Sequence, residues 1–197
     1  SPRPQTGTEP VADPYASLPI PEPGERSDVS SKLKSKNFTL DPGTYCGGLA
    51  IGAGATVKLN PGIYIMKAGQ FTVGSGATVN GDEVMIALVG SNSYLYLNAN
   101  STTRLTSPRD GTYKNMQFMS DRDLSGSKFE QEWTTILSGA TLTYDGVMYL
   151  PEQQFWVSGT AHDVIINANS PSLSIIVDKM WAQGNVTIEV TQKDLRG

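Results

Sequence analysis

The chain has one cysteine, one histidine and no block of charge of either sign. Cys46 is the only cysteine among 197 residues, so no disulfide can form within the chain. One histidine, His162, beside one cysteine cannot make a zinc-binding set. The net charge is −4 and the charged residues are scattered, which argues against a nucleic-acid surface with its clustered basic face. The sequence therefore predicts no cofactor, no metal and no nucleic-acid partner.

Long apolar runs and several catalytic motifs are also missing. No apolar run reaches the roughly 18 residues of a membrane helix, and continuous helix-period amphipathicity is absent. The glycines of GAGATV and GSGATV do not lead into G-K-[ST], so they indicate turns rather than a phosphate-binding loop. No G-x-S-x-G elbow accompanies His162, which we expect in a surface turn. What the chain does have is 20 glycines between short β-type runs.

The first 36 residues differ in composition from the rest. Residues 1–25 contain seven prolines, which favour extended chain and predict a linker or a strap lying on the domain. Residues 26–36 predict a short helical cap, with Ser27 at its start and Val29 and Leu33 on one face. We expect one of these two segments to cover the N-terminal end of the fold. We expect residues 193–197 to be a tail.

Residues 37–192 repeat a pattern of short strands and turns. LDPGTY (Leu40 to Tyr45) returns as LNPGIY (Leu59 to Tyr64), with a start-to-start spacing of 59 − 40 = 19 residues. A second phrase also repeats, as GAGATVKL, GSGATVNG and LSGATLTY. Periods near 20 with short strands are typical of stacked coils, in which each strand pairs in parallel with the strand of the next coil. Leu40 should then stack on Leu59 and Tyr45 on Tyr64, with the Pro-Gly pairs in type II turns.

These observations predict an all-β fold, a right-handed parallel β-helix of about six or seven coils. An antiparallel sandwich is the alternative, because short, evenly spaced strands suit it as well. Asn-Gly and Asp-Gly hairpin turns are rare here, which favours the solenoid. Cys46 is expected to be a small buried side chain, with pairing to a segment outside this chain as the alternative.

The chain also resembles a known family. The phrases LDPGTYCGGLAIGAGATVKLNPGIYIMKAGQFTVGSGATV, SPRDGTYKNMQFMSDRD and ILSGATLTYDGVMYLPEQQFWVSG are similar to the C-terminal β-helical portion of TadG-like proteins of the tight-adherence (Flp) pilus system. The resemblance spans about residues 10 to 190, and PGTYCGG…PGIY…SGATV is its most specific part.

This resemblance implies an extracytoplasmic domain, in the periplasm or at the cell surface, anchored through a membrane segment outside this chain. Its implied partners are pilin or pilus-assembly proteins, with surface glycans as a further possibility. Family members carry a cysteine after the Pro-rich segment that can pair with the one in TYCGG. Here that region reads PIPEPGERSD, so the implied disulfide lacks one partner.

Two sets of side chains are candidates for function. Asp121 and Asp123 are two apart and could form the carboxylate pair of a glycoside-cleaving β-helix, with Lys179 as a third residue. The alternative for these aspartates is a loop in which they cap backbone amides and pair with Arg122. Tyr94 and Tyr96 share a strand face.

Trp156 follows Phe155, so one of this pair can point outward, and outward rings bind sugars or proteins or form structural ladders. The main hypothesis is a non-enzymatic structural or interaction domain. The alternatives are a polysaccharide lyase or hydrolase using the carboxylates, and a glycan-binding adhesin module using Tyr94, Tyr96 and Trp156.

Overall fold

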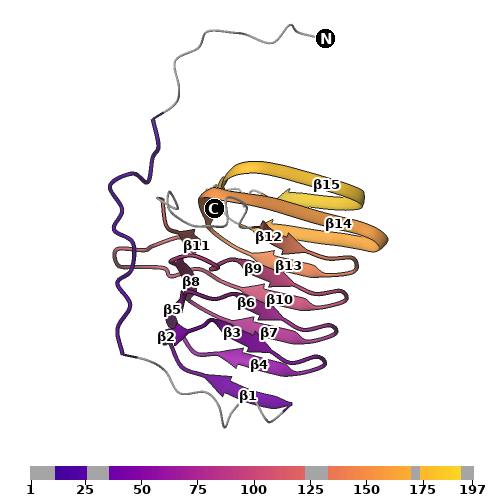
Figure 1. Cartoon of the computed structure of the whole chain (residues 1–197), viewed down its shortest axis with the longest axis horizontal. Coiled ribbons are helices and arrows are strands. Elements are labelled where there is room, and N and C mark those ends of the chain that lie inside the picture. The colour runs from indigo at the N-terminus through magenta and orange to yellow at the C-terminus, as the bar shows by residue number, and fades with distance from the viewer. Residues whose placement is uncertain (1–11, 26–35, 123–132, 170–173, 192–197) are drawn as a thin grey trace, which may run out of the picture.

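All the strands that the structure describes pair in parallel. The computed structural model describes residues 12–25, 36–122, 133–169 and 174–191, and its strands form one 15-stranded sheet. This described part contains no helix. Figure 1 shows the strands stacked in layers, with β1 at one end and β15 at the other. Parallel pairing throughout makes the antiparallel sandwich wrong.

The strands fall into three series, because each pairs with a strand of the next layer rather than with its neighbour in the sequence. The first series is β1 (Asn37–Leu40), β4 (Thr56–Leu59), β7 (Thr78–Gly81), β10 (Thr102–Leu105) and β13 (Thr141–Tyr144). The second series is β2 (Gly43–Cys46), β5 (Gly62–Lys67), β8 (Val84–Val89) and β11 (Met116–Ser120). The third series is β3 (Leu49–Ile51), β6 (Phe71–Val73), β9 (Leu95–Leu97) and β12 (Trp133–Ile136).

Two long strands complete all three series. β14 (Val147–Asn169) pairs in turn with β11, with β12 and with β13 along its length. β15 (Ser174–Thr191) pairs with β14 over the same path. Each long strand thus makes one full layer of the stack, and its register shifts mark where it passes from one series to the next.

The repeated LDPGTY and LNPGIY phrases lie at the same corner of two successive layers, but they are in register only over their first part, because β2 pairs with β5 as Gly43 with Tyr64 and Tyr45 with Met66. Leu40 is in register with Leu59, and the rings of Tyr45 and Tyr64 stack with centroids 5.8 Å apart and planes 15° apart. Each tyrosine hydroxyl donates to the carbonyl four residues earlier, Asp41 O for Tyr45 and Asn60 O for Tyr64. The side-chain amide of Asn60 also donates to the Asp41 carboxylate at 2.7 Å. Each copy of the phrase therefore closes its own corner with a tyrosine hydrogen bond, and the Asn60–Asp41 hydrogen bond joins the two copies.

The predicted type II geometry at this corner is not what the glycines adopt. Gly43 and Gly62 have φ of 147° and 135°, whereas the third position of a type II turn lies near about +80°. Strands β2 and β5 begin at these glycines, so the chain bends while it stays extended. A Cβ on Gly62 would lie 2.7 Å from the Pro42 ring, so the glycine also lets adjacent layers approach.

A second corner recurs in four layers. Gly54, Gly76 and Gly139 have φ between 65° and 74°, and Asn100 takes the same place with φ of 59°. The following residue is buried in every layer and donates its amide to the carbonyl three residues earlier; these residues are Ala55, Ala77, Ser101 and Ala140. Asparagine tolerates this left-handed conformation better than most residues. The third copy, NANSTT, thus escapes a search for Gly-Ala.

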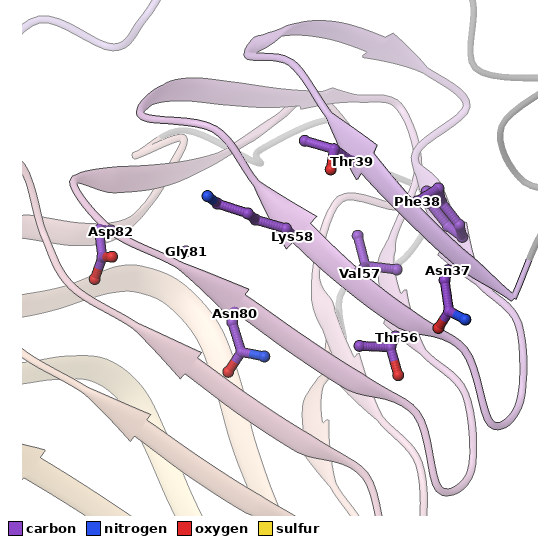
Figure 2. A pocket seen from close by; sticks show the side chains of 9 residues that line it. All are labelled: Asn37, Phe38, Thr39, Thr56, Val57, Lys58, Asn80, Gly81 and Asp82. Carbon is purple, nitrogen blue, oxygen red and sulfur yellow. The ribbon is translucent and has the colours of Figure 1, made fainter.

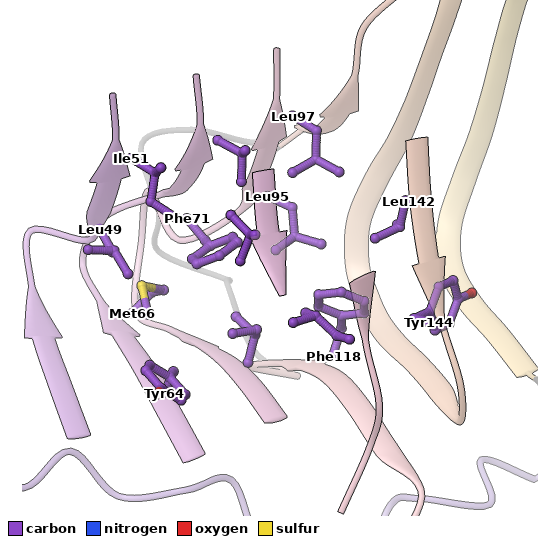
Figure 3. Packing of buried hydrophobic residues seen from close by; sticks show 14 of the residues in the cluster. Leu49, Ile51, Tyr64, Met66, Phe71, Leu95, Leu97, Phe118, Leu142 and Tyr144 are labelled. Carbon is purple, nitrogen blue, oxygen red and sulfur yellow. The ribbon is translucent and has the colours of Figure 1, made fainter. Parts of the chain in front are cut away.

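Inward-facing side chains fill the space between the three series. Figure 3 shows Leu49, Ile51, Phe71 and Leu95 on the third series pointing toward Phe118 on the second and Leu142 on the first. Alternation is regular, so that β9 and β12 bury every second residue. The other residues of these strands point outward.

A second apolar cluster lies under the proline-rich strap, residues 12–25. Tyr15, Leu18 and Ile20 of the strap pack on outward side chains of the second series such as Met85 and Met119. In Figure 1 the strap runs in indigo along one side of the stack. In its described residues the strap therefore covers a side of the fold rather than the N-terminal end. The predicted helical cap falls on residues 26–35, outside the described ranges.

Cys46 is exposed, so the expectation of a buried side chain is wrong. It is the last residue of β2, where the chain leaves the strand for Gly47 and Gly48. Tyr45 points into the core, so alternation along the strand turns Cys46 outward. No helix able to span a membrane occurs in the described part of the chain.

Candidate functional site

Three aromatic residues singled out from the sequence lie on the outer face of the third series. Tyr96 belongs to β9, and Tyr94 immediately precedes this strand. Both are partly exposed, whereas Leu95 and Leu97 between and beyond them are buried. Trp156 lies in β14 between buried Phe155 and Val157, so it also points outward and is partly exposed.

The register between layers adds two tryptophans to this face. Thr135 of β12 is in register with both Tyr96 and Trp156, which places Trp133 level with Tyr94. Trp156 is in register with Trp181 of β15. The rings of Trp133 and Trp156 pack with centroids 5.2 Å apart and planes tilted by 58°. We call Tyr94, Tyr96, Trp133, Trp156 and Trp181 the aromatic face.

The polar residues around the aromatic face are mainly amides and hydroxyls. Gln70 of the preceding layer donates through its side-chain amide to the Tyr94 hydroxyl. Thr72 and Thr135 flank Tyr96 in register, and Gln154 is level with Trp133. At the β15 end, Lys179 forms an exposed ion pair with Asp178 at 3.4 Å.

A buried hydrogen-bond network holds the layers beneath this face. Thr134 donates to Gln153 Oε1 at 2.8 Å, and the Gln153 amide donates to the Ser93 carbonyl at 2.8 Å. The Ser93 hydroxyl contacts the carbonyls of Met66 and Val89 at 3.2 and 2.9 Å. Because satisfied buried networks fix a unique arrangement, the outward rings are held in place by the interior of several layers.

The candidate acidic pair is only partly described. Asp121 Oδ2 accepts the Gly90 amide at 2.6 Å, so this carboxylate caps the corner of a neighbouring layer. Asp123 lies outside the described residues. Arg122, between them, donates to the carbonyls of Tyr15 and Leu18 in the strap and to the Tyr149 hydroxyl. Asp121 thus fits the amide-capping interpretation, and Arg122 serves the strap.

The strap contacts carry the clearest electrostatic effects among these residues. The Tyr149 hydroxyl donates to Asp13 at 2.6 Å, and this hydrogen bond is the main reason why the pKa of Asp13 is lowered. Burial is the main cause of the raised pKa of Tyr149. The Arg122 guanidinium also lies 5.3 Å from the centre of the Tyr149 ring. These groups fasten the strap to the stack.

Other candidate chemistry is sparse. His162 lies within β14 rather than in a turn, where the register shifts between Gly159 and Val164. No group of three or more His, Cys, Asp or Glu able to hold a metal occurs among the described residues.

A groove of about 440 Å³ crosses the first series. Figure 2 shows Lys58, Asn80 and Asp82 among the side chains that line it, beside Thr39 and Thr56. One cation and one carboxylate beside amides and hydroxyls make a mixed polar surface. This groove lies on β1, β4 and β7, whereas the aromatic face lies on the third series.

The sequence missed Trp133 and Trp181 because their neighbours in the sequence give no sign of the face. Trp133 follows the charged stretch KFEQE, and Trp181 follows DKM. The signal that could find them is register between layers: Trp133 lies in β12, and Trp181 lies in β15 in register with Trp156. Comparisons with known proteins add no assignment, since the chain matches no family model and is not significantly similar to any curated protein or solved structure.

Proposed function

We propose that the chain is a non-enzymatic interaction domain built on a short right-handed parallel β-solenoid of about six coils. Three series of parallel strands, completed by β14 and β15, support this description of the fold. A right-handed path agrees with the strong preference of parallel crossover connections. Such a stack presents side chains at fixed intervals of about 4.8 Å along its axis.

The aromatic face is the single observation that carries the proposal. Its rings come from four successive layers, and Trp181 is 52% exposed. Large, partly exposed aromatic side chains on a rigid support are typical of binding surfaces, because they offer contact area with little entropy left to lose. We infer that a partner binds across β9, β12 and the centres of β14 and β15.

For the biological setting we propose a TadG-like role in an extracytoplasmic pilus-assembly or adhesion system. The support is the PGTYCGG…PGIY…SGATV series and the phrases that follow it. Pilin or pilus-assembly proteins are then the first partners to test. Membrane anchoring would involve a segment outside this chain.

The geometry of Asp121 favours binding over catalysis. Its carboxylate is engaged by the Gly90 amide at 2.6 Å, whereas a glycosidase carboxylate must face the sugar and a second carboxylate across it. Lys179 is paired with Asp178 at the far end of the stack. These contacts support the non-enzymatic role.

Binding to the pilin and assembly proteins of the source organism tests the role directly. We expect the Trp156→Ala, Trp181→Ala double variant to bind at least about tenfold more weakly, as loss of interface anchors does. Lys58→Ala, in the groove on the first series, is the matched control and should bind like the unchanged protein. Equal binding by all three proteins would refute the role of the aromatic face.

A polysaccharide panel tests the enzymatic alternative. Depolymerisation that disappears in Asp121→Asn, with the thermal unfolding midpoint unchanged, would replace the non-enzymatic proposal. Loss of activity together with loss of stability would show only that the cap at Gly90 matters for folding, so Lys179→Ala would then be compared for activity alone.

A further inference from the structure

The aromatic face forms a row along the stack axis. Tyr94 and Tyr96 lie in one layer, followed by Trp133, Trp156 and Trp181 in the next three. Three steps between layers of about 4.8 Å give the row a length of about 14 Å. The step between layers is of the same order as the length of one pyranose unit in an extended glycan chain. A linear ligand can therefore meet ring after ring.

The charges of this face also restrict the ligand. At the described outward positions near the rings, Gln70, Thr72, Thr135 and Gln154 are uncharged, while Glu152 of β14, two residues before Gln154, is an exposed carboxylate. On β15, Lys179 is in register with Gln154 and forms an ion pair with its neighbour Asp178. An acidic ligand would lose hydration here and meet the Glu152 carboxylate without gaining an unpaired cation among these residues, which is costly.

We propose that the aromatic face binds a neutral carbohydrate chain that lies along the stack axis. This inference rests on the proposed function and names the ligand class of the same surface. The apolar C–H face of a sugar ring packs on an aromatic ring, as other apolar surface does. The hydroxyls around the sugar ring can donate to and accept from the Gln154 side chain, and they can donate to Thr135 and Thr72, whose own hydroxyls donate to the Trp133 carbonyl and to Gln70.

The tryptophans provide a reporter that is specific to this face. The chain has three tryptophans, and Trp133, Trp156 and Trp181 are all of them. Intrinsic tryptophan fluorescence therefore reports on the aromatic face and on no other surface. Soluble neutral oligosaccharides of glucose, mannose, xylose or N-acetylglucosamine, with about two to six units, are the probes, chosen to bracket the length of the row.

We expect a saturable change of tryptophan emission with at least one neutral oligomer, with affinity that rises with chain length until the row is covered. Trp181→Ala should weaken binding about tenfold or more, while Lys58→Ala should leave it unchanged. Trp181 is 52% exposed, so its replacement should not disturb folding, which a thermal unfolding curve checks.

Three results would overturn the inference. One is the absence of any emission change, confirmed by calorimetry, across the neutral panel. Another is binding that Trp181→Ala leaves intact, and the last is tighter binding of acidic oligosaccharides such as oligogalacturonate. If pilus proteins still bind through Trp156 and Trp181 in that case, the ligand class is wrong and the interaction role remains. If neither binds, both proposals fail.

Discussion

Replacing Tyr64 by phenylalanine removes a single oxygen atom from a ring that has no exposed surface. The hydroxyl lies 2.8 Å from the Leu40 carbonyl and 2.9 Å from the Asn60 carbonyl, and it has one proton to share between them. The Leu40 carbonyl also accepts a hydrogen bond from the backbone amide of Asn60 at 2.9 Å, so this carbonyl keeps a partner in the variant. The Asn60 carbonyl loses this donor.

The cost follows from these contacts. A typical hydrogen bond contributes about 0.5–1.5 kcal/mol, and a buried polar group left without a partner costs about 1–3 kcal/mol. Because one acceptor keeps its amide donor, we expect the free energy of unfolding to fall by about 1–2 kcal/mol. The stacked contact with Tyr45 is retained, since the ring itself is unchanged.

Urea unfolding followed by circular dichroism measures this loss, with a midpoint lowered by about 0.5–1 M for an ordinary dependence on urea. Tyr96→Phe is the control, because Tyr96 is an outward residue and its loss of a hydroxyl should change stability by less than about 0.5 kcal/mol. If Tyr64→Phe is as stable as Tyr96→Phe, the tyrosine of the repeated phrase serves packing alone and the self-closing corner is refuted.

Three further outcomes are expected. Asn100→Ala should lower the free energy of unfolding by about 1–2 kcal/mol because alanine resists the left-handed conformation that Asn100 holds, while Asn100→Gly should not; equal losses in thermal unfolding would contradict this. Arg122→Ala should free the strap and speed its cleavage by protease, since the guanidinium holds two strap carbonyls, and an unchanged cleavage rate would show that apolar packing suffices. Burial, reinforced by the Asp41 carboxylate, raises the pKa of Tyr45 from 10.0 to about 12, so the stability from the neutral phenol is present below pH 10 and is lost as the pH rises toward 12. Chemical unfolding at several alkaline pH values should show this fall, and Tyr45→Phe should make it shallower; a variant that falls as steeply would contradict the assignment.

The parallel all-β fold and the stacking of Leu40 on Leu59 could be predicted because both follow from short sequence phrases that repeat along the chain. A short phrase repeated at a near-constant interval predicts the register of β1 with β4, but the second half of the phrase is offset by two residues, so that Gly43 pairs with Tyr64. The period becomes longer after Leu105, where the loop between Thr106 and Asn115 separates β10 from β11. Register across such an insertion is set by the core and not by spacing.

The same reason explains what the sequence missed at the candidate site. Tyr94 and Tyr96 could be assigned to one strand face because alternation is local. Their alignment with Trp133, beyond the insertion, depends on pairing between β9 and β12. The strap contacts of Arg122 join residues more than one hundred positions apart, and no local pattern encodes them.

Exposure of Cys46 shows a further limit. Burial preference by residue type favoured the interior, but the position at the end of β2 decides the outcome. Tyr45 faces the core, so strand alternation places Cys46 on the outer side, and residue type alone does not show this.

The central claim is that successive layers lie in register along the third series, because only then do the rings form one face. Gln154 and Lys179 are in register in adjacent layers, and a protein with Cys46→Ser, Gln154→Cys and Lys179→Cys can be labelled with pyrene at both positions. The account predicts strong excimer emission, since adjacent layers lie about 4.8 Å apart. Monomer emission alone, equal to that of a Lys58→Cys, Lys179→Cys control pair, would contradict it.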